Sequence, residues 1–327
     1  MQVQISPTVD AIDYLIEDCA ELELDVNLVS VSGNEIVLNG PAAETIKIDL
    51  ATSNYSMLEK VLAGLKFNFS ELPLLVTGES KEIRLLTPKI SVAKLLPTVY
   101  SFTHNRYGSV RGTDDVRARF SSNIFRAMAN NPGPYHLGTA FLGIIENETG
   151  PLMAERVVDA SNLEIRVKRF HIGSPVHRYK YTEKYPTLAG PALDKWSRFD
   201  SPVVCFDWRH PLEDDNGNRL ADEPISDDYA AVWVSDVARA KQLAREAFLW
   251  LETRFFESNL ELIDICFFID TSGSILFGEI SPDCMRVRNI SENNNYSLDK
   301  DQWRNGSSEE IVLAKYKELS DRVCANL

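Results

Sequence analysis

Long apolar runs and a basic leader are both missing from this sequence. No apolar stretch approaches the roughly 18 residues that a membrane-spanning helix needs. The first residues, MQVQISPTVDAIDYLIEDC, carry acids within their apolar part and have no basic start, so they do not resemble a signal peptide. We therefore expect a soluble, cytoplasmic protein without a membrane partner.

Cysteine is scarce, and its spacing excludes two kinds of site. The number of cysteines is odd, and no two have Cys-x-x-Cys spacing: Cys19, Cys205, Cys266, Cys284 and Cys324. This pattern argues against a disulfide framework and against a zinc site. No carboxylate or cysteine stands at metal-ligand spacing from His171 or His177, so we predict no metal site there. We expect Cys266, inside an apolar strand, to be a small buried hydrophobe.

Positive charge is in deficit as well. The sequence has 34 Lys and Arg against 48 Asp and Glu, which gives a formal net charge of −14. Nucleic acids and anionic membranes attract positive surfaces, so this charge argues against a non-specific binder of nucleic acid or of an anionic membrane. A local basic pocket for one small phosphorylated ligand is compatible with this charge.

The patterns that are present indicate an α+β fold. Hydrophobic residues make up 44% of 327 residues, enough for a sizeable core. Apolar residues at helical spacing predict helices over residues 9–24, 55–65, 235–257 and 308–325, the third capped by Ser235. Residues 1–80 read as an α/β module for docking or dimerisation, so a homo-oligomer is expected. Residues 181–228, rich in Pro, Asp, Asn and Gly, predict a long covering loop.

The segment 260–289, LELIDICFFIDTSGSILFGEISPDCMRVRN, predicts a buried hairpin. Its turn contains Gly273, which is free to take positive φ. Glu279, Ser281, Asp283 and Arg286 then follow within eight residues. The segment is either an ordinary core hairpin with a solvated end, or a rigid platform that presents these groups to a ligand.

Two further segments have the composition of anion sites. Residues 104–119 are either a solvated loop before a helix or an anion-binding loop, and their basic residues are His104, Arg106, Arg111, Arg117 and Arg119. Residues 162–179 begin as a strand of period two. That strand ends at Gly173-Ser174-Pro175, where backbone N–H groups and a hydroxyl could meet a phosphate.

Four blocks of the sequence resemble SAICAR synthetases, purine-pathway ligases that join aspartate to a carboxyaminoimidazole ribotide using ATP. The blocks are GEISPDCMR (278–286), LEIRVKRFHIGS (163–174), the pair DSPVVCFDWRH (200–210) and ADEPIS (221–226), and LDKDQWR (298–304). The chain is therefore identified as a divergent member of this family. The resemblance implies antiparallel sheets flanked by helices, with 81–160 as a diverged N-terminal lobe and 161–327 as a C-terminal lobe carrying the ribotide site.

The resemblance also implies the site residues. Lys168, Ser174 and Arg286 would hold the 5′-phosphate of a ribonucleotide, for which cations and a turn hydroxyl are chemically suited. Lys300 and Arg304 would line the same site. The candidates for acid–base chemistry are Glu279, Asp283, Asp222, His171 and His104.

ATP and Mg²⁺ are the cofactors that the resemblance implies, but the matched residues differ from the family pattern. Cys266 occupies the position of a lysine in the family pattern. Phe268 and Gly278 occupy the positions of a metal-binding glutamate and a metal-binding aspartate. Mg²⁺ requires several oxygen ligands, so these substitutions argue against the family's ATP site. Asp270 would be a substitute ligand if the turn were shifted, and no residue is assigned to a cofactor.

Three functions remain open. The first is an ADP-forming ligase that joins a carboxylated ribotide to an amine. The second is an ATP-independent enzyme that remodels a phosphoribosylated heterocycle in a nucleoside antibiotic pathway. The third is a non-catalytic nucleotide-binding scaffold.

Overall fold

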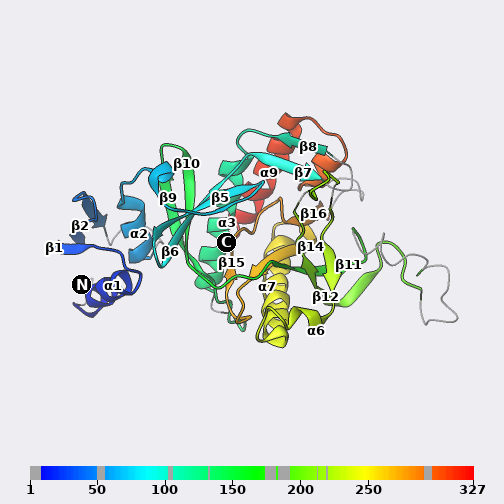
Figure 1. Ribbon diagram of the computed structural model, residues 1–327, viewed down its shortest axis with the longest axis horizontal. Coiled ribbons are helices and arrows are strands. Elements are labelled where there is room, and N and C mark those ends of the chain that lie inside the picture. Colours follow the sequence, from blue (N-terminus) through cyan, green and yellow to red (C-terminus); the bar gives the residue numbers. More distant parts are fainter. Residues whose placement is uncertain are drawn as a thin grey trace. The chain divides into compact units, whose positions relative to one another are not determined.

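The computed structural model describes residues 9–49, 56–101, 106–131, 133–173, 182, 192–211, 213–218, 220–290 and 297–327. The chain divides into two compact units. The first unit comprises Met1–Thr98, Arg111–Ala127 and Ala140–Val158, and the second comprises Val99–Val110, Met128–Thr139 and Asp159–Leu327. Figure 1 gives the element labels used below. Helices and antiparallel strands occur in both units, which confirms the predicted α+β class.

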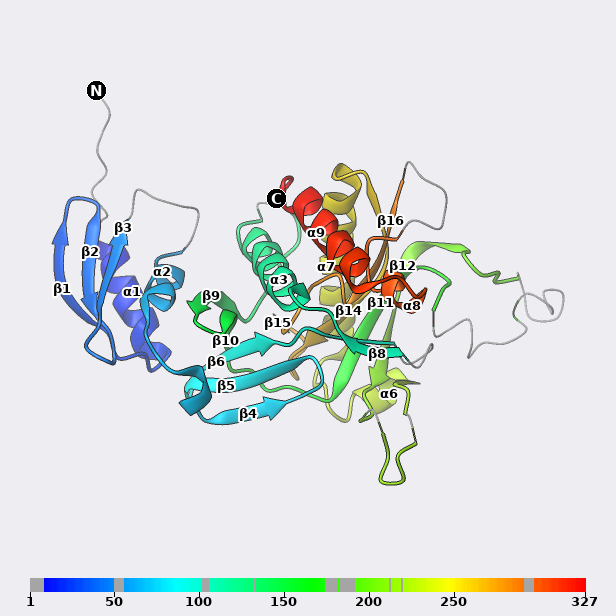
Figure 2. The same ribbon diagram turned by 90° about the horizontal axis from the view of Figure 1, so that it is seen from above.

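The first unit begins with a small antiparallel sheet and two helices. Its strands β1 (Asn27–Ser32), β2 (Glu35–Asn39) and β3 (Thr45–Asp49) pair in chain order, beside the helices α1 (Val9–Glu21) and α2 (Met57–Gly64) (Figure 2). Alternate residues of β2 and β3 are buried, as expected for strands with one covered face. Both helices were predicted within three residues of these bounds, whereas β3 was not anticipated.

A second sheet of the first unit shares its core with the small sheet. Its antiparallel order is β4 (Leu74–Thr77), β5 (Lys81–Thr87), β6 (Ile90–Leu95), β10 (Gly150–Arg156) and β9 (Phe141–Asn147), and a short 3₁₀ turn (Phe69–Glu71) precedes it. Buried apolar residues of β6, β9 and β10 form one cluster with those of α1 and α2. The helix α3 (Thr113–Ala129) belongs to this unit up to Ala127.

The second unit is built on a six-stranded sheet. The order is β13 (Glu223–Ile225), β12 (Arg198–Trp208), β11 (Leu163–Phe170), β14 (Leu260–Ile269) and β15 (Leu276–Phe277), and β16 (Met285–Asn289) also pairs with β14. The smaller elements are the ribbon of β7 (Thr98–Ser101) with β8 (Arg106–Ser109), and the helices α6 (Asp227–Ala230), α8 (Asp301–Arg304) and α9 (Glu309–Cys324). The first strand of the predicted hairpin, β14, therefore pairs with β11, β15 and β16, whereas its second strand, β15, stands at the end of the strand order. Gly273 takes φ +78° in the turn between them.

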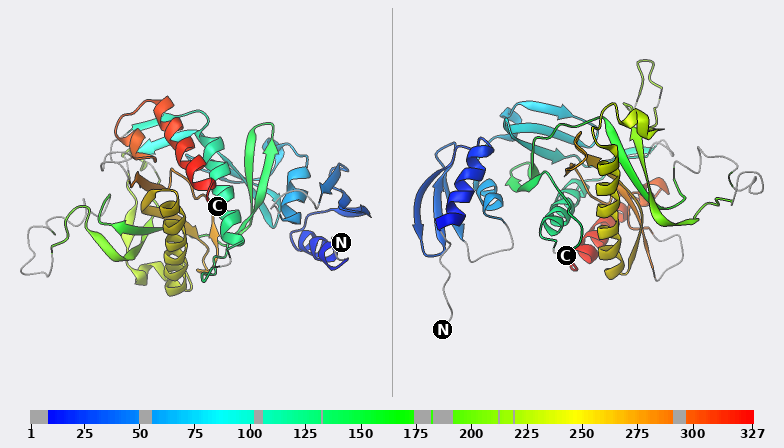
Figure 3. Two further views of the ribbon diagram at one scale, coloured as in Figure 1. Left: turned by 180° about the vertical axis from the view of Figure 1, so that it is seen from behind. Right: turned by 90° about the horizontal axis from the view of Figure 1, so that it is seen from below.

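The two faces of this sheet differ in chemistry. The helix α7 (Val237–Glu257) packs on β14, β12 and β11 and covers one face (Figure 3). Ile165, Val167 and Phe206 are buried on that face. By strand alternation, Arg166 and Lys168 point to the opposite face, which we call the polar face.

Two sequence predictions in this region are wrong. The predicted covering loop 181–228 contains β12, β13 and α6, because Arg198–Trp208 pairs with β11 along most of its length and so gains backbone hydrogen bonds. The cap of α7 is Asp236, whose carboxylate accepts a hydrogen bond from Arg239 N at 2.8 Å. Ser235 instead donates its hydroxyl to Thr271 O. In the part of the chain that is described, no helix combines the length and apolar character needed to cross a membrane.

Candidate functional site

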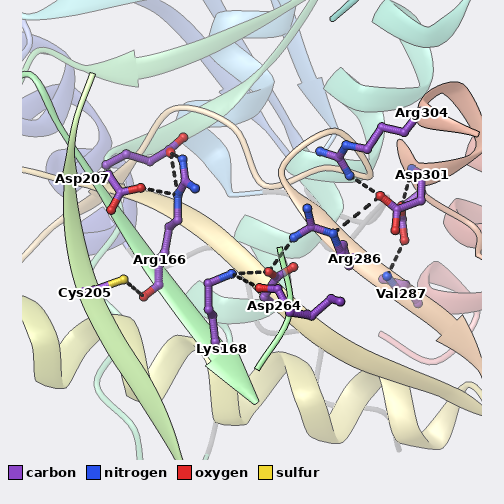
Figure 4. A network of polar contacts seen from close by, with 12 residues as sticks. Arg166, Lys168, Cys205, Asp207, Asp264, Arg286, Val287, Asp301 and Arg304 are labelled. Atoms are coloured by element: carbon purple, nitrogen blue, oxygen red, sulfur yellow. Dashed lines mark hydrogen bonds and ion pairs between the residues drawn. The ribbon is translucent and has the colours of Figure 1, made fainter. Parts of the chain in front are cut away.

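A buried carboxylate, Asp264, joins two of the predicted site cations. Lys168 Nζ lies 2.5 Å from Asp264 Oδ2, and Arg286 Nη1 lies 2.7 Å from the same oxygen (Figure 4). Lys168 Nζ also donates to Ile172 O at 3.3 Å. The three residues come from β11, β14 and β16, and their side chains meet on the polar face.

Strand register explains why these side chains meet. Lys168 is opposite Asp264 in the β11–β14 pair, and Asp264 is opposite Arg286 in the β14–β16 pair. Burial opposes ionisation of Asp264, but Arg286 and then Lys168 outweigh it and hold the pKa of this carboxyl below its usual range. The pKa of Arg286 is lowered by burial and raised more strongly by Asp264 and Asp301, so its guanidinium stays charged.

The turn after β11 brings backbone against the Arg286 guanidinium. Gly173 has φ +76°, and a Cβ at this position would lie 2.9 Å from Arg286 Nη1. Only glycine tolerates both the backbone angle and this close approach. Ser174, the next predicted phosphate ligand, lies outside the described residues.

The segment before and within α8 extends the charged network. Asp301 Oδ1 lies 3.5 Å from Arg286 Nε and also pairs with Arg304 Nη1 (Figure 4). Asp299 accepts hydrogen bonds from the backbone N–H groups of Val287 at 2.5 Å and Asp301 at 2.6 Å. Burial and the neighbouring Asp301 raise the pKa of Asp299 to about 8. We call Lys168, Asp264, Arg286, Asp301 and Arg304 the cationic cluster.

Lys300 and Asp283, two other predicted site residues, form a pair of their own. Lys300 Nζ lies 2.7 Å from Asp283 Oδ2, and Tyr316 donates its hydroxyl to Asp283 Oδ1 at 3.0 Å. These contacts tie the exit of the hairpin to the segment before α8 and to α9. The carboxylate that was proposed for acid–base chemistry is thus held by a lysine and a tyrosine.

A second group of charges surrounds Arg166, the neighbour of Lys168 on the polar face. Its guanidinium lies 2.9 Å from Glu164 Oε2, 3.0 Å from Asp207 Oδ2 and 3.3 Å from Asp222 Oδ2. Burial and Glu164 raise the pKa of Asp222, whereas Arg166 holds the pKa of Glu164 below its usual value despite burial. The predicted acid–base residue Asp222 therefore belongs to this group, and His210 N donates to its other oxygen at 3.3 Å.

Cys266 faces Arg166 across the β11–β14 pair. Burial, followed by the charge of Glu164, raises the pKa of its thiol well above the usual value. At neutral pH this side chain is therefore an uncharged thiol.

Of the three remaining acid–base candidates, Glu279 and His171 are described and both are buried. Glu279 accepts a hydrogen bond from the hydroxyl of Ser281. His171 follows β11, and its ring makes an edge contact with Phe199 at a centroid distance of 6.5 Å. His104 and His177 lie outside the described residues.

The basic segment 104–119 has structural contacts at three of its arginines. The Arg106 guanidinium stacks 3.6 Å from the centroid of the Trp303 ring and donates to Trp303 O at 2.6 Å. Arg117 is fully buried and donates to Leu96 O at 2.9 Å. Arg119 pairs with Asp115 and Glu146. These contacts give the three arginines structural partners, and they favour neither the solvated loop nor the anion-binding loop considered from the sequence.

The residues at the matched Mg²⁺ positions do not fit a metal–nucleotide. Phe268 lies opposite Phe277 with their rings 5.7 Å apart, and the Arg209 guanidinium stacks 4.9 Å from the Phe268 ring. Asp270, the substitute ligand, accepts the backbone N–H groups of Ser274 and Ile275, each at 2.9 Å, and so closes its own turn. Within the described ranges, no three His, Cys, Asp or Glu side chains cluster in a way that could hold a metal ion.

Sequence reasoning missed the residues that organise both groups. Asp264 and Arg166 were not singled out as site residues. Each is a charged residue within a strand segment that is otherwise apolar or alternating. A buried charge requires a partner, so these charges could have indicated a cluster of charged side chains.

The fold and the site together define an α+β protein whose central sheet presents clustered cations on one face. The family model described as SAICAR synthetase matches residues 86–322. This chain therefore belongs to the SAICAR synthetase family, which confirms the resemblance seen in the four sequence blocks.

Two relatives show how far the chain has diverged. Bifunctional cordycepin biosynthesis cluster protein 3 of Cordyceps militaris is 28% identical over 299 residues, covering 77% of this chain. The match covers 33% of that protein, so the chain spans about a third of its length. Phosphoribosylaminoimidazole-succinocarboxamide synthase of a Synechococcus species is 27% identical over 266 residues, covering 78% of this chain and 95% of that protein.

Solved structures share the fold at lower identity. The synthase from Ehrlichia chaffeensis superposes with a TM-score of 0.61 at 18% identity, covering 78% of this chain and 99% of that one. A SAICAR synthetase in complex with ADP gives 0.60 at 20% identity, covering 76% and 96%. SAICAR synthase from Saccharomyces cerevisiae complexed with SAICAR gives 0.60 at 18% identity, covering 80% and 98%.

Proposed function

We propose that this protein is an enzyme that binds a ribotide and holds the ligand's 5′-phosphate at Lys168 and Arg286. The observation that carries the proposal is the convergence of both cations on Asp264, beside the Gly173 turn. A protein binds a phosphate group with hydrogen-bond donors and positive charge, and a lysine beside an arginine supplies both. Arg286 is about one-fifth exposed, so a ligand can reach it. The SAICAR complex of the yeast relative supports this class of ligand.

For the reaction, we propose remodelling of the heterocycle without ATP, by acid–base chemistry at the Arg166 group. Asp222 is the leading acid–base residue, because burial and Glu164 raise its pKa and it lies 3.3 Å from the Arg166 guanidinium. The aromatic pair Phe268 and Phe277 offers no oxygen to a metal–nucleotide. The relative named for a cordycepin biosynthesis cluster supports a place in a nucleoside pathway.

A second candidate is ATP-dependent joining of a carboxylated ribotide to an amine. Family membership and the ADP complex of one solved relative favour it. Glu279 is the one acidic residue that remains at the matched metal positions. The third alternative is a non-catalytic nucleotide-binding scaffold, which would convert neither ligand.

Calorimetry on the full chain separates these functions. We expect 5-aminoimidazole ribotide to bind and Mg·ATP to give no heat. Arg286→Ala should weaken ribotide affinity by about 1.5–3 kcal/mol, the usual loss for a hydrogen bond to a charged group. Arg254→Ala, at an exposed pair on α7, is the control and should leave affinity unchanged. Tight Mg·ATP binding would favour the ligase, and binding of neither compound would contradict the ribotide proposal.

A further inference from the structure

The polar face of the central sheet carries two adjacent groups of charge. Arg166 and Lys168 are two residues apart on β11, so their side chains project from the same face about 7 Å apart along the strand. Their partners on β14, Cys266 and Asp264, are adjacent in the same way. The cationic cluster and the Arg166 group are therefore neighbours on the polar face of the sheet (Figure 4).

The Arg166 group has an excess of negative charge. Three carboxylates, which we call the acidic group, lie within 3.3 Å of the Arg166 guanidinium: Glu164, Asp207 and Asp222. The positive charge of Arg209 also favours the ionised forms of Glu164 and Asp222, although burial and Glu164 still leave the pKa of Asp222 raised. Among the described residues, three carboxylates thus face two cations, Arg166 and Arg209, and the Cys266 thiol adds no charge.

The cationic cluster has the opposite balance. Lys168, Arg286 and Arg304 face two carboxylates, Asp264 and Asp301. The third carboxyl nearby, Asp299, has its pKa raised to about 8, so at neutral pH it is mostly protonated and uncharged. An anion is favoured at the cationic cluster and disfavoured at the acidic group.

We infer that the ribotide bound here carries an uncharged or cationic heterocycle, rich in N–H donors and without a carboxylate, which lies against the acidic group. The inference rests on the proposed function and specifies its substrate class. A ligand whose phosphate lies at Lys168 and Arg286 has its heterocycle within reach of the neighbouring Arg166 group. Amino and ring N–H groups can donate to the carboxylate oxygens there, whereas a carboxylate on the ring would meet like charges.

The test compares ribotides that differ in one substituent. The probes are 5-aminoimidazole ribotide, its 4-carboxamide and its 4-carboxylate, titrated into the full chain at pH 7.5 by calorimetry. All three share the phosphoribosyl group, so their affinity ratio reports the heterocycle alone. We expect the carboxamide to bind at least tenfold more tightly than the carboxylate.

Two variants link that ratio to the acidic group. Asp222→Asn removes one negative charge and should narrow the ratio several-fold. Cys266→Lys adds a cation beside Glu164 and should narrow it further or reverse it. Asp228→Asn, an exposed carboxylate on α6, is the matched control and should leave the ratio unchanged.

The outcomes are distinguishable. Equal affinities, tighter binding of the carboxylate, or a ratio that Asp222→Asn does not change would overturn the inference while the ribotide proposal stands. Failure of all three ribotides to bind would remove the proposed function and this inference with it.

Discussion

Lys168 and Arg286 contact the same oxygen atom, Oδ2 of Asp264, from two strands that flank β14. One carboxylate therefore holds two buried or half-buried cations close together in the free protein. Without Asp264, the two cations would repel each other in a site where water screens them weakly. With it, they are positioned before a ligand arrives, which reduces the cost of ordering them on binding.

Asp264→Asn should lower stability and make it depend on anions. Loss of one partner leaves buried cations uncompensated, and the unfolding free energy should fall by about 3 kcal/mol. Inorganic phosphate should recover part of the loss, because it supplies the missing negative charge. Urea unfolding with and without phosphate measures both effects, with Asp228→Asn as the control. An equal loss at all phosphate concentrations would mean that these cations do not form an anion site.

Gly173→Ala should reduce both the stability of the protein and its affinity for the ribotide, whereas the positive φ alone would reduce only stability. A residue with Cβ at positive φ costs about 1–2 kcal/mol. The added methyl at position 173 would also displace the Arg286 guanidinium and weaken ribotide binding several-fold. Gly217→Ala is the matched control, because Gly217 has φ +77° and nothing lies within 4 Å of its Cβ position. Similar thermal shifts and unchanged ribotide affinity for both variants would refute a role for the contact with Arg286.

Glu59→Gln should destabilise the first unit. Glu59 accepts hydrogen bonds from Arg126 Nε at 2.9 Å and Nη2 at 2.5 Å, and its side chain is only 5% exposed. The substitution leaves the Arg126 charge without a partner and should cost about 3 kcal/mol. Glu146→Gln breaks a comparable pair with Arg119 on the same helix, but both side chains are about half exposed, so its cost should stay below about 1 kcal/mol. Urea denaturation followed by circular dichroism measures the unfolding free energy of the two variants. Equal losses of unfolding free energy would contradict a larger contribution from the buried Glu59–Arg126 pair.

Asp299 should make the protein less stable as pH rises towards 8. Its pKa is about 8 in the folded chain and about 3.9 in an unfolded one, so between these values the folded state binds more protons. The contribution is complete below about pH 4 and is lost as pH rises through about 8. Asp299→Asn stays neutral and should flatten the slope of unfolding free energy between pH 5 and pH 8. Parallel pH profiles for the two proteins would show that Asp299 does not carry this dependence.

Local pattern was enough to predict several elements of the fold. Apolar residues at helical spacing identified α1, α2, α7 and α9, and turn composition located the hairpin at Gly273. The same reasoning missed β12, since a strand stabilised by pairing on both edges needs no strong local signal. It also placed the cap of α7 one residue early, because Ser235 and Asp236 are both good capping residues.

The sequence by itself determined the α+β class and the four blocks that resemble the family. It also identified Lys168 and Arg286 as candidates for a phosphate site. Only the tertiary structure decided that these two cations share Asp264 and that Arg166 lies among three carboxylates. The reason is strand register: which side chains face one another is set by how β11, β12, β14 and β16 pair, and those strands are distant in sequence.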